Sequence, residues 1–179
     1  GTFRGEALGV GDYNNDGKIT DADRTWIGVP HPDFMYGLNI NLEYKNFDLT
    51  MFWQGVYNTD VINDQKYHTD FWSVSETGSN KGVRLLDAWS PSNPDSSIPA
   101  LSITDSNWES RMSTYFVENG SYLKLRTLQL GYSLPKVYSK RIGLEQFRLY
   151  VSGQNLLTIK SKSFTGIDPE TPGFGYPIP

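Results

Sequence analysis

Two stretches of alternating apolar and polar residues, separated by only two residues, constrain the fold most. In residues 36–44 the even positions are Tyr, Leu or Ile and the odd positions are Gly, Asn or Glu. Residues 47–57 alternate in the same way, with Phe47, Leu49, Met51, Trp53 and Tyr57 on one parity and Asp48, Thr50 and Gln54 on the other. This period of two is typical of strands with one apolar face, and the Lys45–Asn46 link is short enough for a tight turn. The sequence therefore predicts an antiparallel hairpin over residues 36–57.

Two further strands are predicted later in the chain, over residues 121–134 and 146–157. The first of them changes parity, since its apolar residues are Leu123 and Leu125 and then Leu128, Leu130, Tyr132 and Leu134. A β-bulge, one extra residue in the strand, is needed near Arg126 or Thr127 to keep these side chains on one face. Residues 135–143 begin with Pro and end with Gly, which predicts a short helical turn between the two strands.

The connections between these segments alternate in length. Two residues join the first pair, 63 residues (58–120) lead to the third segment, and 11 lead to the fourth. Short turns on one side and long loops on the other are typical of transmembrane β-barrels, which have short periplasmic turns and long extracellular loops. Because a barrel needs at least about eight strands, the prediction is an all-β fold of antiparallel amphipathic strands that form only part of a transmembrane β-barrel.

Residues 12–23 carry the pattern of a single EF-hand-like calcium loop. Its oxygen-bearing side chains at positions 1, 3, 5, 9 and 12 are Asp12, Asn14, Asp16, Thr20 and Asp23, and the Lys18 carbonyl supplies position 7. Gly17 stands where the sharp turn needs positive φ. These residues predict one structural Ca²⁺, bound weakly because Asp at position 12 has a shorter bidentate reach than Glu. The alternative is a solvated turn in which Asp and Asn hydrogen-bond their own backbone.

The segments that flank this loop are unlike those of a paired calcium sensor. Residues 5–11 hold three glycines, which disfavour a helix before the loop, whereas residues 21–27 could form a short one. We divide the chain into a calcium-loop segment, residues 1–35, and a set of partial barrel strands, residues 36–179, with a long loop at 58–120.

Charge and residue usage argue against several other classes of function. The net charge of −4 and the lack of a Lys/Arg cluster argue against nucleic-acid binding. The two histidines have no catalytic partners at telling spacing, so no enzyme is expected. The first residues have no apolar signal-peptide region and no initial Met, so we expect a piece of a longer chain.

Aromatic side chains lie among polar ones in residues 58–120, and two uses compete for them. Exposed rings beside Asp and Asn stack on sugars. The candidate substrate-binding residues on this interpretation are Tyr67, Trp72, Trp89 and Trp108. The commoner use of such rings is to pack a folded loop or a partner protein.

Three basic side chains on the predicted strands also have two interpretations. Lys124, Arg126 and Arg148 could line the polar interior of a barrel and meet acidic groups of a substrate or of a loop. Alternatively, they could form cross-strand pairs with Glu43 or Asp48.

Eight short phrases follow one another along the chain, at residues 12–28, 30–38, 43–49, 52–57, 89–94, 118–126, 130–135 and 150–157. They include Glu118-Asn119-Gly120-Ser121-Tyr122-Leu123-Lys124-Leu125-Arg126 and Tyr150-Val151-Ser152-Gly153-Gln154-Asn155-Leu156-Leu157. Together they resemble the C-terminal region of the SusC/RagA family of TonB-dependent outer-membrane transporters. The chain stops at Pro179, where family members continue into one last strand.

The resemblance implies uptake of an oligosaccharide, or less often a peptide, across the outer membrane of a Bacteroidetes-type bacterium. It also implies energisation through TonB and capping by a SusD-like lipoprotein, with the calcium loop and residues 58–120 extracellular. The alternative is a soluble calcium-dependent β-domain that binds glycan or protein.

The environment of the apolar strand face distinguishes the transporter interpretation from the soluble β-domain interpretation. Coverage of this face by the chain's own side chains would favour the soluble domain, whereas in a barrel the face meets lipid. For the isolated chain we expect either that residues 58–120 fold across this face or that two copies pair through it.

Overall fold

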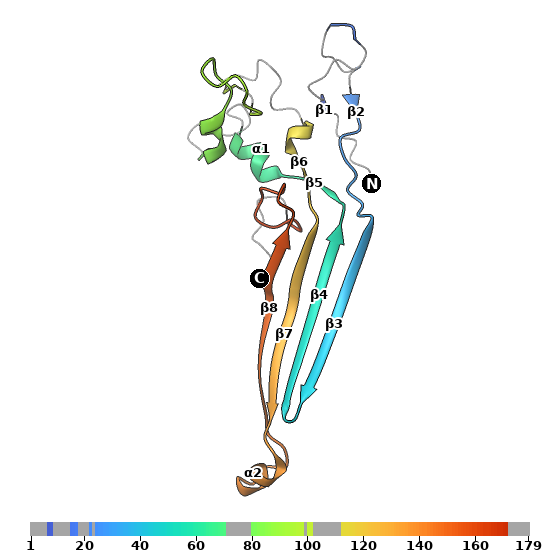
Figure 1. Cartoon of the computed structure of the whole chain (residues 1–179), viewed down its shortest axis with the longest axis vertical. Helices are drawn as coiled ribbons and strands as arrows, with labels where there is room; N and C mark the ends of the chain where they lie inside the picture. Colours follow the sequence, from blue (N-terminus) through green and yellow to red (C-terminus); the bar gives the residue numbers. More distant parts are fainter. Residues whose placement is uncertain are drawn as a thin grey trace.

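The computed structural model describes residues 7–8, 15–17, 22, 24–70, 80–98, 100–101 and 112–171, and it is built around a four-stranded antiparallel sheet (Figure 1). The strands in order are β3 (Phe34–Tyr44), β4 (Phe47–Tyr57), β7 (Tyr122–Ser133) and β8 (Arg148–Lys160). All four predicted strands are present. β4 has the predicted bounds, and the ends of the other strands differ from prediction by at most three residues.

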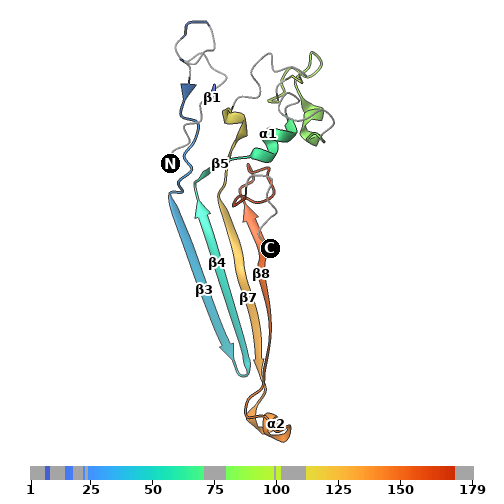
Figure 2. The ribbon, with the colours of Figure 1, turned by 180° about the vertical axis from the view of Figure 1, so that it is seen from behind.

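The smaller elements gather at one end of the sheet, except for α2 (Lys136–Arg141), which lies at the other (Figure 1 and Figure 2). They are β1 (Ala7–Leu8), β2 (Arg24–Thr25), β5 (Asp60–Ile62), β6 (Val117–Asn119), α1 (Asp64–Asp70) and the 3-10 turns Val83–Asp87 and Thr114–Phe116. The helix considered over 21–27 does not form in its second half, because Arg24 and Thr25 pair with β1 instead. No helix in the described part of the chain is long and apolar enough to cross a membrane.

The β3–β4 hairpin and the turn before β8 follow the sequence predictions. Tyr44 pairs with Phe47 across the two-residue link, and Lys45 adopts a φ of 55°. The helical turn is α2, which follows Pro135, and Gly143 beyond it has a φ of 77°. Both predictions are confirmed.

The predicted bulge lies at Arg126. Phe52 pairs with Thr127 and Trp53 with Leu125, so Arg126 has no partner on β4. On the other side of β7, Asn155 and Leu156 of β8 stand opposite Arg126, and Asn155 has a φ of 50°. The extra residue keeps the leucines before and after the bulge on one face of the sheet, as the parity change required.

The β5–β6 pair continues the β4–β7 pair beyond the main sheet. Asp60 pairs with Asn119 and Ile62 with Val117, and the Gly120 N–H donates to the Thr59 carbonyl at 2.7 Å. The long connection therefore leaves and returns at a single neck. Its described elements lie at the end of the sheet and not across its apolar face (Figure 1). The described parts of residues 58–120 do not fold across this face as expected, because the neck and the polar contacts described below hold them at the strand ends. Pairing of two copies through the face stays a prediction.

The apolar face of the sheet is left uncovered by the parts of the chain that the structure describes. Leu38 is 55% exposed and Leu42 is 56% exposed, while Ile40 and Trp53 are half-buried by their strand neighbours. A soluble domain would bury such side chains, each of which contributes about 1.5 to 3 kcal/mol when removed from water. The exposed face therefore counts against the soluble reading.

Aromatic rings mark both ends of this apolar face. Phe34 stacks on Tyr57 at the loop end, with ring centroids 5.0 Å apart, and Phe47 contacts Tyr132 at the other end at 4.7 Å. From Phe34 to Tyr44 the strand extends about 33 Å, or about 25 Å in height if it is tilted by about 40°. That height equals the apolar band of about 25 Å in transmembrane barrels.

Candidate functional site: two polar clusters at the loop end

The polar face of the sheet receives the segment that follows β8, residues 161–171. Lys124 on β7 is 1% exposed, and its ammonium donates to both carboxylate oxygens of Asp168, at 2.9 and 2.6 Å, and to Glu170. Arg126 also donates to Glu170, and the Tyr122 hydroxyl donates to the same carboxylate at 2.6 Å. We call these five residues the β7 cluster. It ties residues 161–171 to the sheet through two cations and two carboxylates.

The bulge in β7 supplies part of this geometry. Arg126 reaches Gln54 of β4 at 2.8 Å and Asn155 of β8 at 3.1 Å, so its guanidinium links three strands. Arg126 is two residues after Lys124, so alternation gives both cations the polar face. The extra residue then lets Leu128 return to the apolar face that Leu125 occupies.

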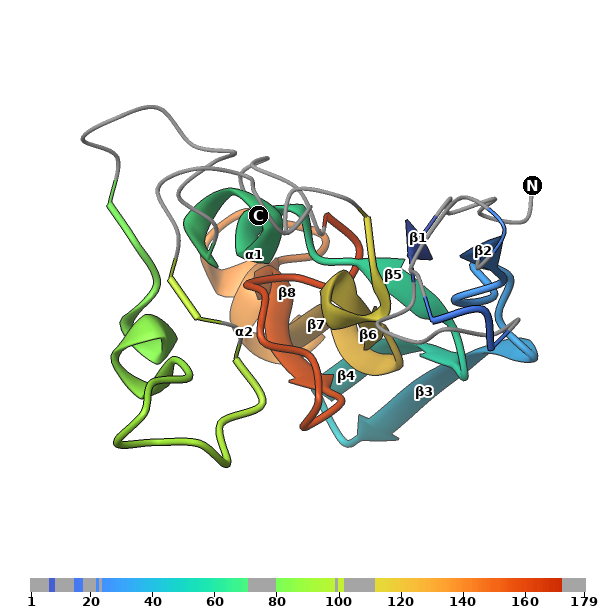
Figure 3. The same cartoon turned by 90° about the horizontal axis from the view of Figure 1, so that it is seen from above.

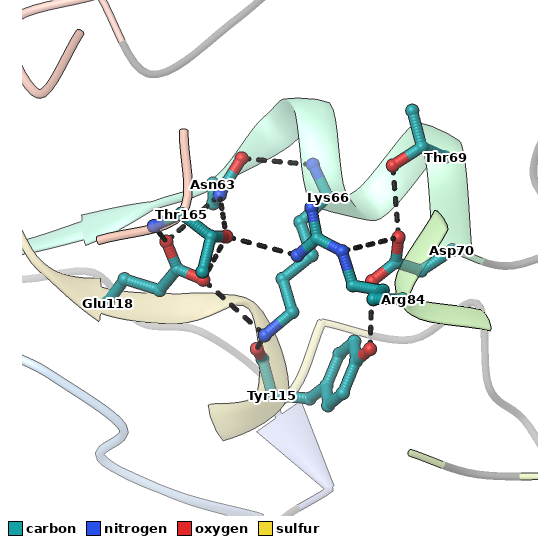
Figure 4. Close-up of polar contacts among 8 residues, drawn as sticks. All are labelled: Asn63, Lys66, Thr69, Asp70, Arg84, Tyr115, Glu118 and Thr165. Atoms are coloured by element: carbon teal, nitrogen blue, oxygen red, sulfur yellow. Dashed lines mark hydrogen bonds and ion pairs between the residues drawn. The ribbon is translucent and has the colours of Figure 1, made fainter. Parts of the chain in front are cut away.

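A second cluster joins the long connection to the same segment (Figure 4). Glu118 on β6 accepts hydrogen bonds from Asn63 at 2.9 Å and from the backbone and hydroxyl of Thr165, both at 2.8 Å. Asn63 is fully buried and also caps α1, since its side-chain oxygen accepts from the Lys66 N–H at 2.9 Å. Seen from above, α1, β6 and the end of β8 lie together over the sheet (Figure 3).

The other half of this second cluster surrounds Asp70, which is buried at the end of α1. Asp70 accepts from the Tyr115 hydroxyl at 2.8 Å and pairs with the Arg84 guanidinium at 3.4 Å. The Lys66 ammonium donates to the Tyr115 carbonyl at 2.6 Å and lies 3.8 Å from the centre of the Tyr115 ring. We call Asn63, Lys66, Thr69, Asp70, Arg84, Tyr115, Glu118 and Thr165 the loop cluster.

Burial and charge shift the protonation equilibria of these groups. Burial alone would raise the pKa of Glu118, but hydrogen bonds from Thr165 and Asn63 and the nearby Lys66 ammonium outweigh it and lower the pKa. Burial alone would also raise the pKa of Glu170. The hydrogen bonds from Lys124 and Tyr122 and the charges of Lys124 and Arg126 outweigh this effect, and the pKa is lowered. Burial lowers the pKa of Lys66, and burial together with Asp70 raises the pKa of Tyr115. Both glutamates are therefore ionised at neutral pH.

We expect residues 161–171 to loosen in acid. A carboxyl group whose pKa is lowered by folding stabilises the fold above its unfolded pKa, near 4.5 for Glu118 and Glu170, and the effect disappears as pH falls through the folded pKa. Hydrogen exchange of these amides, corrected for the intrinsic effect of pH, should accelerate below about pH 4.5. In Glu170→Gln the acceleration should shrink. An unchanged acid response in that variant would contradict the assignment to Glu170.

The two clusters are internally saturated. Within the described residues, the Thr171 hydroxyl oxygen stands alone as a buried side-chain polar atom without a hydrogen-bond partner. No group of three or more His, Asp or Glu side chains in that part of the chain is arranged to hold a metal ion. The clusters therefore position the loops through contacts within the chain.

The structure separates the two interpretations of the basic strand residues. Lys124 and Arg126 meet acidic groups of a loop, Asp168 and Glu170. Arg148 instead forms a cross-strand pair with Asp48, with Nε at 3.1 Å from the carboxylate. This pair bridges β7 over Gly131, where a Cβ atom would collide with the Asp48 carboxylate.

The candidate substrate residues are only partly within the described structure. Tyr67 packs against the fully buried Phe116, with ring centroids 5.1 Å apart, whereas the Trp89 side chain is exposed. Trp72 and Trp108 lie outside the described residues. The contact of Tyr67 fits a packing role, and Trp89 remains available for stacking.

The predicted calcium ligands also lie mostly outside the described residues, which include Asp16 but not Asp12, Asn14, Lys18, Thr20 or Asp23. Gly17 has a φ of 79° and Asn15 a φ of 59°, so the chain turns sharply where the pattern requires it. Ala7 pairs with Thr25 and Leu8 with Arg24, which brings the two ends of the loop region together. The calcium site itself stays a prediction.

Sequence reasoning missed the acidic side of both clusters. Asp168 and Glu170 lie in a tail that reads only as Pro- and Gly-rich, and Glu118 and Thr165 are 47 positions apart. Lys124 on a predicted polar face was the available signal for an acidic partner, since a buried cation requires a carboxylate beside it.

Comparison with known proteins gives relatives of one kind, although no protein-family model matches the chain. TonB-dependent receptor P3 of Formosa agariphila is 38% identical over 162 residues, which are 89% of this chain and 15% of the relative. TonB-dependent receptor SusC of Bacteroides thetaiotaomicron is 29% identical over 163 residues, again 89% of this chain and 15% of the relative. The chain thus spans about 15% of the length of these curated relatives.

Solved structures agree with the sequence relatives. The structure of the RagAB peptide transporter superimposes with a TM-score of 0.72 at 26% identity, covering 87% of this chain and 17% of that one. The RagAB peptide importer in its open-open state gives a TM-score of 0.67 at 26% identity, over 91% of this chain and 18% of that one. The chain therefore belongs to the SusC/RagA family of TonB-dependent receptors and matches its C-terminal region, as the sequence resemblance predicted.

Proposed function

We propose that this chain forms part of the wall and outer loops of a transporter that imports oligosaccharides or peptides across the outer membrane. The single observation that carries the proposal is the uncovered apolar face of the sheet, bordered by aromatic rings at both ends. The opposite face carries the β7 cluster and the Asp48–Arg148 pair, as expected of a polar barrel interior. In this arrangement TonB supplies the energy, and a SusD-like lipoprotein covers the loop end.

Oligosaccharide and peptide are both retained as substrate classes. The relatives include SusC, and the similar solved structures are described as a peptide transporter and a peptide importer. Exposed Trp89 suits stacking on a sugar. Uptake of labelled oligosaccharides and peptides by cells that carry the complete receptor, compared with cells that lack it, decides between the two classes.

The proposal places residues 58–120 outside the cell and the Lys45–Asn46 turn in the periplasm. Epitope tags inserted at Ser79 or Asp95 of the complete receptor should bind antibody on intact cells. A tag between Lys45 and Asn46 should bind only after the outer membrane is permeabilised. Reversed accessibility would overturn the orientation, and full accessibility of all three tags would overturn the membrane topology.

We also propose that residues 12–23 bind one structural Ca²⁺ on the extracellular side. The donors are carboxylate, amide and carbonyl oxygens, which Ca²⁺ prefers, and the turn at Asn15–Gly17 and the β1–β2 pairing support a closed loop. Calorimetry should detect one bound Ca²⁺ that disappears in the variant Asp12→Ala with Asp16→Ala. Tyr13→Phe, which changes no predicted ligand, should bind normally. Undiminished binding in the double variant would remove the site.

A further inference from the structure

Helix α2 presents an amphipathic surface that no part of the described chain covers. Val137 is 67% exposed, Tyr138 is 56% exposed and Ile142, directly after the helix, is 62% exposed. Lys136, Lys140 and Arg141 are exposed beside them, and none of the three forms an ion pair within the described residues. We call these six residues the α2 surface.

Apolar and basic side chains stand next to one another on the exposed part of the helix. Lys136 and Lys140, four residues apart, share one side, and Tyr138 lies on another, while Val137 falls between Lys140 and Arg141. Ser139 is fully buried and marks the side that packs on the chain. The apolar and the basic side chains are therefore both exposed, on the sides of the helix away from Ser139.

The position of α2 along the sheet places this surface near the edge of the apolar face. The ladder of β7 and β8 ends with the Leu134 N–H donating to the Phe147 carbonyl at 2.8 Å, and α2 begins two residues later. From Tyr132, in the aromatic border, to Leu134 the strand rises by about 7 Å. A bilayer headgroup layer is roughly 5 to 8 Å deep on each side. The chain thus enters α2 at about headgroup depth, beside Phe147, whose carbonyl accepts from Leu134 and whose side chain is exposed.

We propose that the α2 surface docks on an anionic phospholipid surface at the short-turn side of the membrane. This inference rests on the proposed transporter function. Tyr138 and Ile142 would enter the boundary between headgroups and acyl chains, and the lysines and Arg141 would extend their ammonium and guanidinium groups to lipid phosphates. The match in charge favours anionic lipid over an uncharged bilayer.

The chain contains no cysteine, so a reporter cysteine is its single thiol, and any cysteine elsewhere in the complete receptor is first replaced by Ser. The complete receptor is reconstituted in phosphatidylcholine bilayers with and without phosphatidylglycerol, and an environment-sensitive fluorophore is attached at Tyr138→Cys. Leu38→Cys reports on the apolar face, and Leu86→Cys, at a 90% exposed apolar position on the loop end, is the matched control. We expect blue-shifted emission and quenching by lipid-bound quenchers at Leu38 and Tyr138, and a water-like signal at Leu86.

The charge requirement is tested with Lys136→Gln and Lys140→Gln. Each lysine near an anionic surface favours the docked state by about fivefold, so each variant should lower the ratio of docked to undocked Tyr138 reporter by about fivefold in the phosphatidylglycerol bilayers. A water-like Tyr138 signal beside a lipid-like Leu38 signal overturns the docking and leaves the transporter function standing. Shielding at Tyr138 that lipid quenchers cannot reach indicates a protein partner and also overturns it. A water-like signal at Leu38 overturns the transporter function itself.

Discussion

Lys124→Met should lower the free energy of unfolding by about 3 to 5 kcal/mol, the range for removal of one partner from a buried ion pair. The reason is that Asp168 and Glu170 stay in place while the cation that both contact is lost. Denaturant titration of the complete receptor in detergent or lipid measures the change. Proteolysis within residues 161–171 should also become faster, because the β7 cluster holds this segment.

Two further variants distinguish the effect of losing the ion pairs from the effect of losing side-chain packing on stability. Lys162→Met changes an exposed lysine of the same segment and should alter stability little. Adding Asp168→Asn to Lys124→Met should recover part of the loss, since Asp168 then carries no unpaired charge and Glu170 keeps its pair with Arg126. A cost for Lys124→Met as small as that of Lys162→Met would refute the structural role of the β7 cluster.

Leu38→Arg should destabilise the membrane-inserted protein by about 2 to 4 kcal/mol, the cost of an arginine at the lipid-facing midplane of a barrel. Leu38 is one residue from the middle of β3 and 55% exposed on the apolar face. Unfolding titrations in lipid vesicles measure the effect. Expression of the variant in cells should show a matching decrease of receptor in the outer membrane.

Asn39→Arg is the matched control for this substitution. Asn39 is the next residue along β3, so its side chain lies on the polar face. The same arginine there should cost much less, because that face meets water or polar groups. Equal costs at the two positions would mean that the sheet does not stand in a bilayer with its apolar face outward.

The strands and their register could be predicted because they depend on local alternation. The apolar residues change from odd to even positions after Leu125, so a single apolar face requires one extra residue there. The structure places this residue at Arg126. The start of the β7–β8 turn followed similarly from Pro135, and its end from Gly143. Each of these features depends on residues that are neighbours in the sequence.

The clusters could not be predicted in the same way because their partners are distant in the sequence. Lys124 meets Asp168 across 44 positions, and Asn63 meets Thr165 across 102. No periodicity links such residues, and any exposed carboxylate of the chain was an equal candidate for Lys124. The described parts of residues 58–120 differ from the expectation for a related reason, since it considered apolar burial and not the polar contacts that hold these parts at the strand ends.

The β5–β6 neck has a consequence for how this protein can change. Because Ile62 pairs with Val117, residues 63–116 form an excursion whose two ends are already joined outside the main sheet. Lengthening a loop that is closed in this way adds only about 0.6 kcal/mol of closure entropy per doubling of its length. The register of β4 and β7 is fixed below the neck and does not depend on what lies above it. Residues 63–116 can therefore be exchanged as one unit together with their partners Glu118 and Thr165, so that the surface at the loop end changes while the main sheet does not.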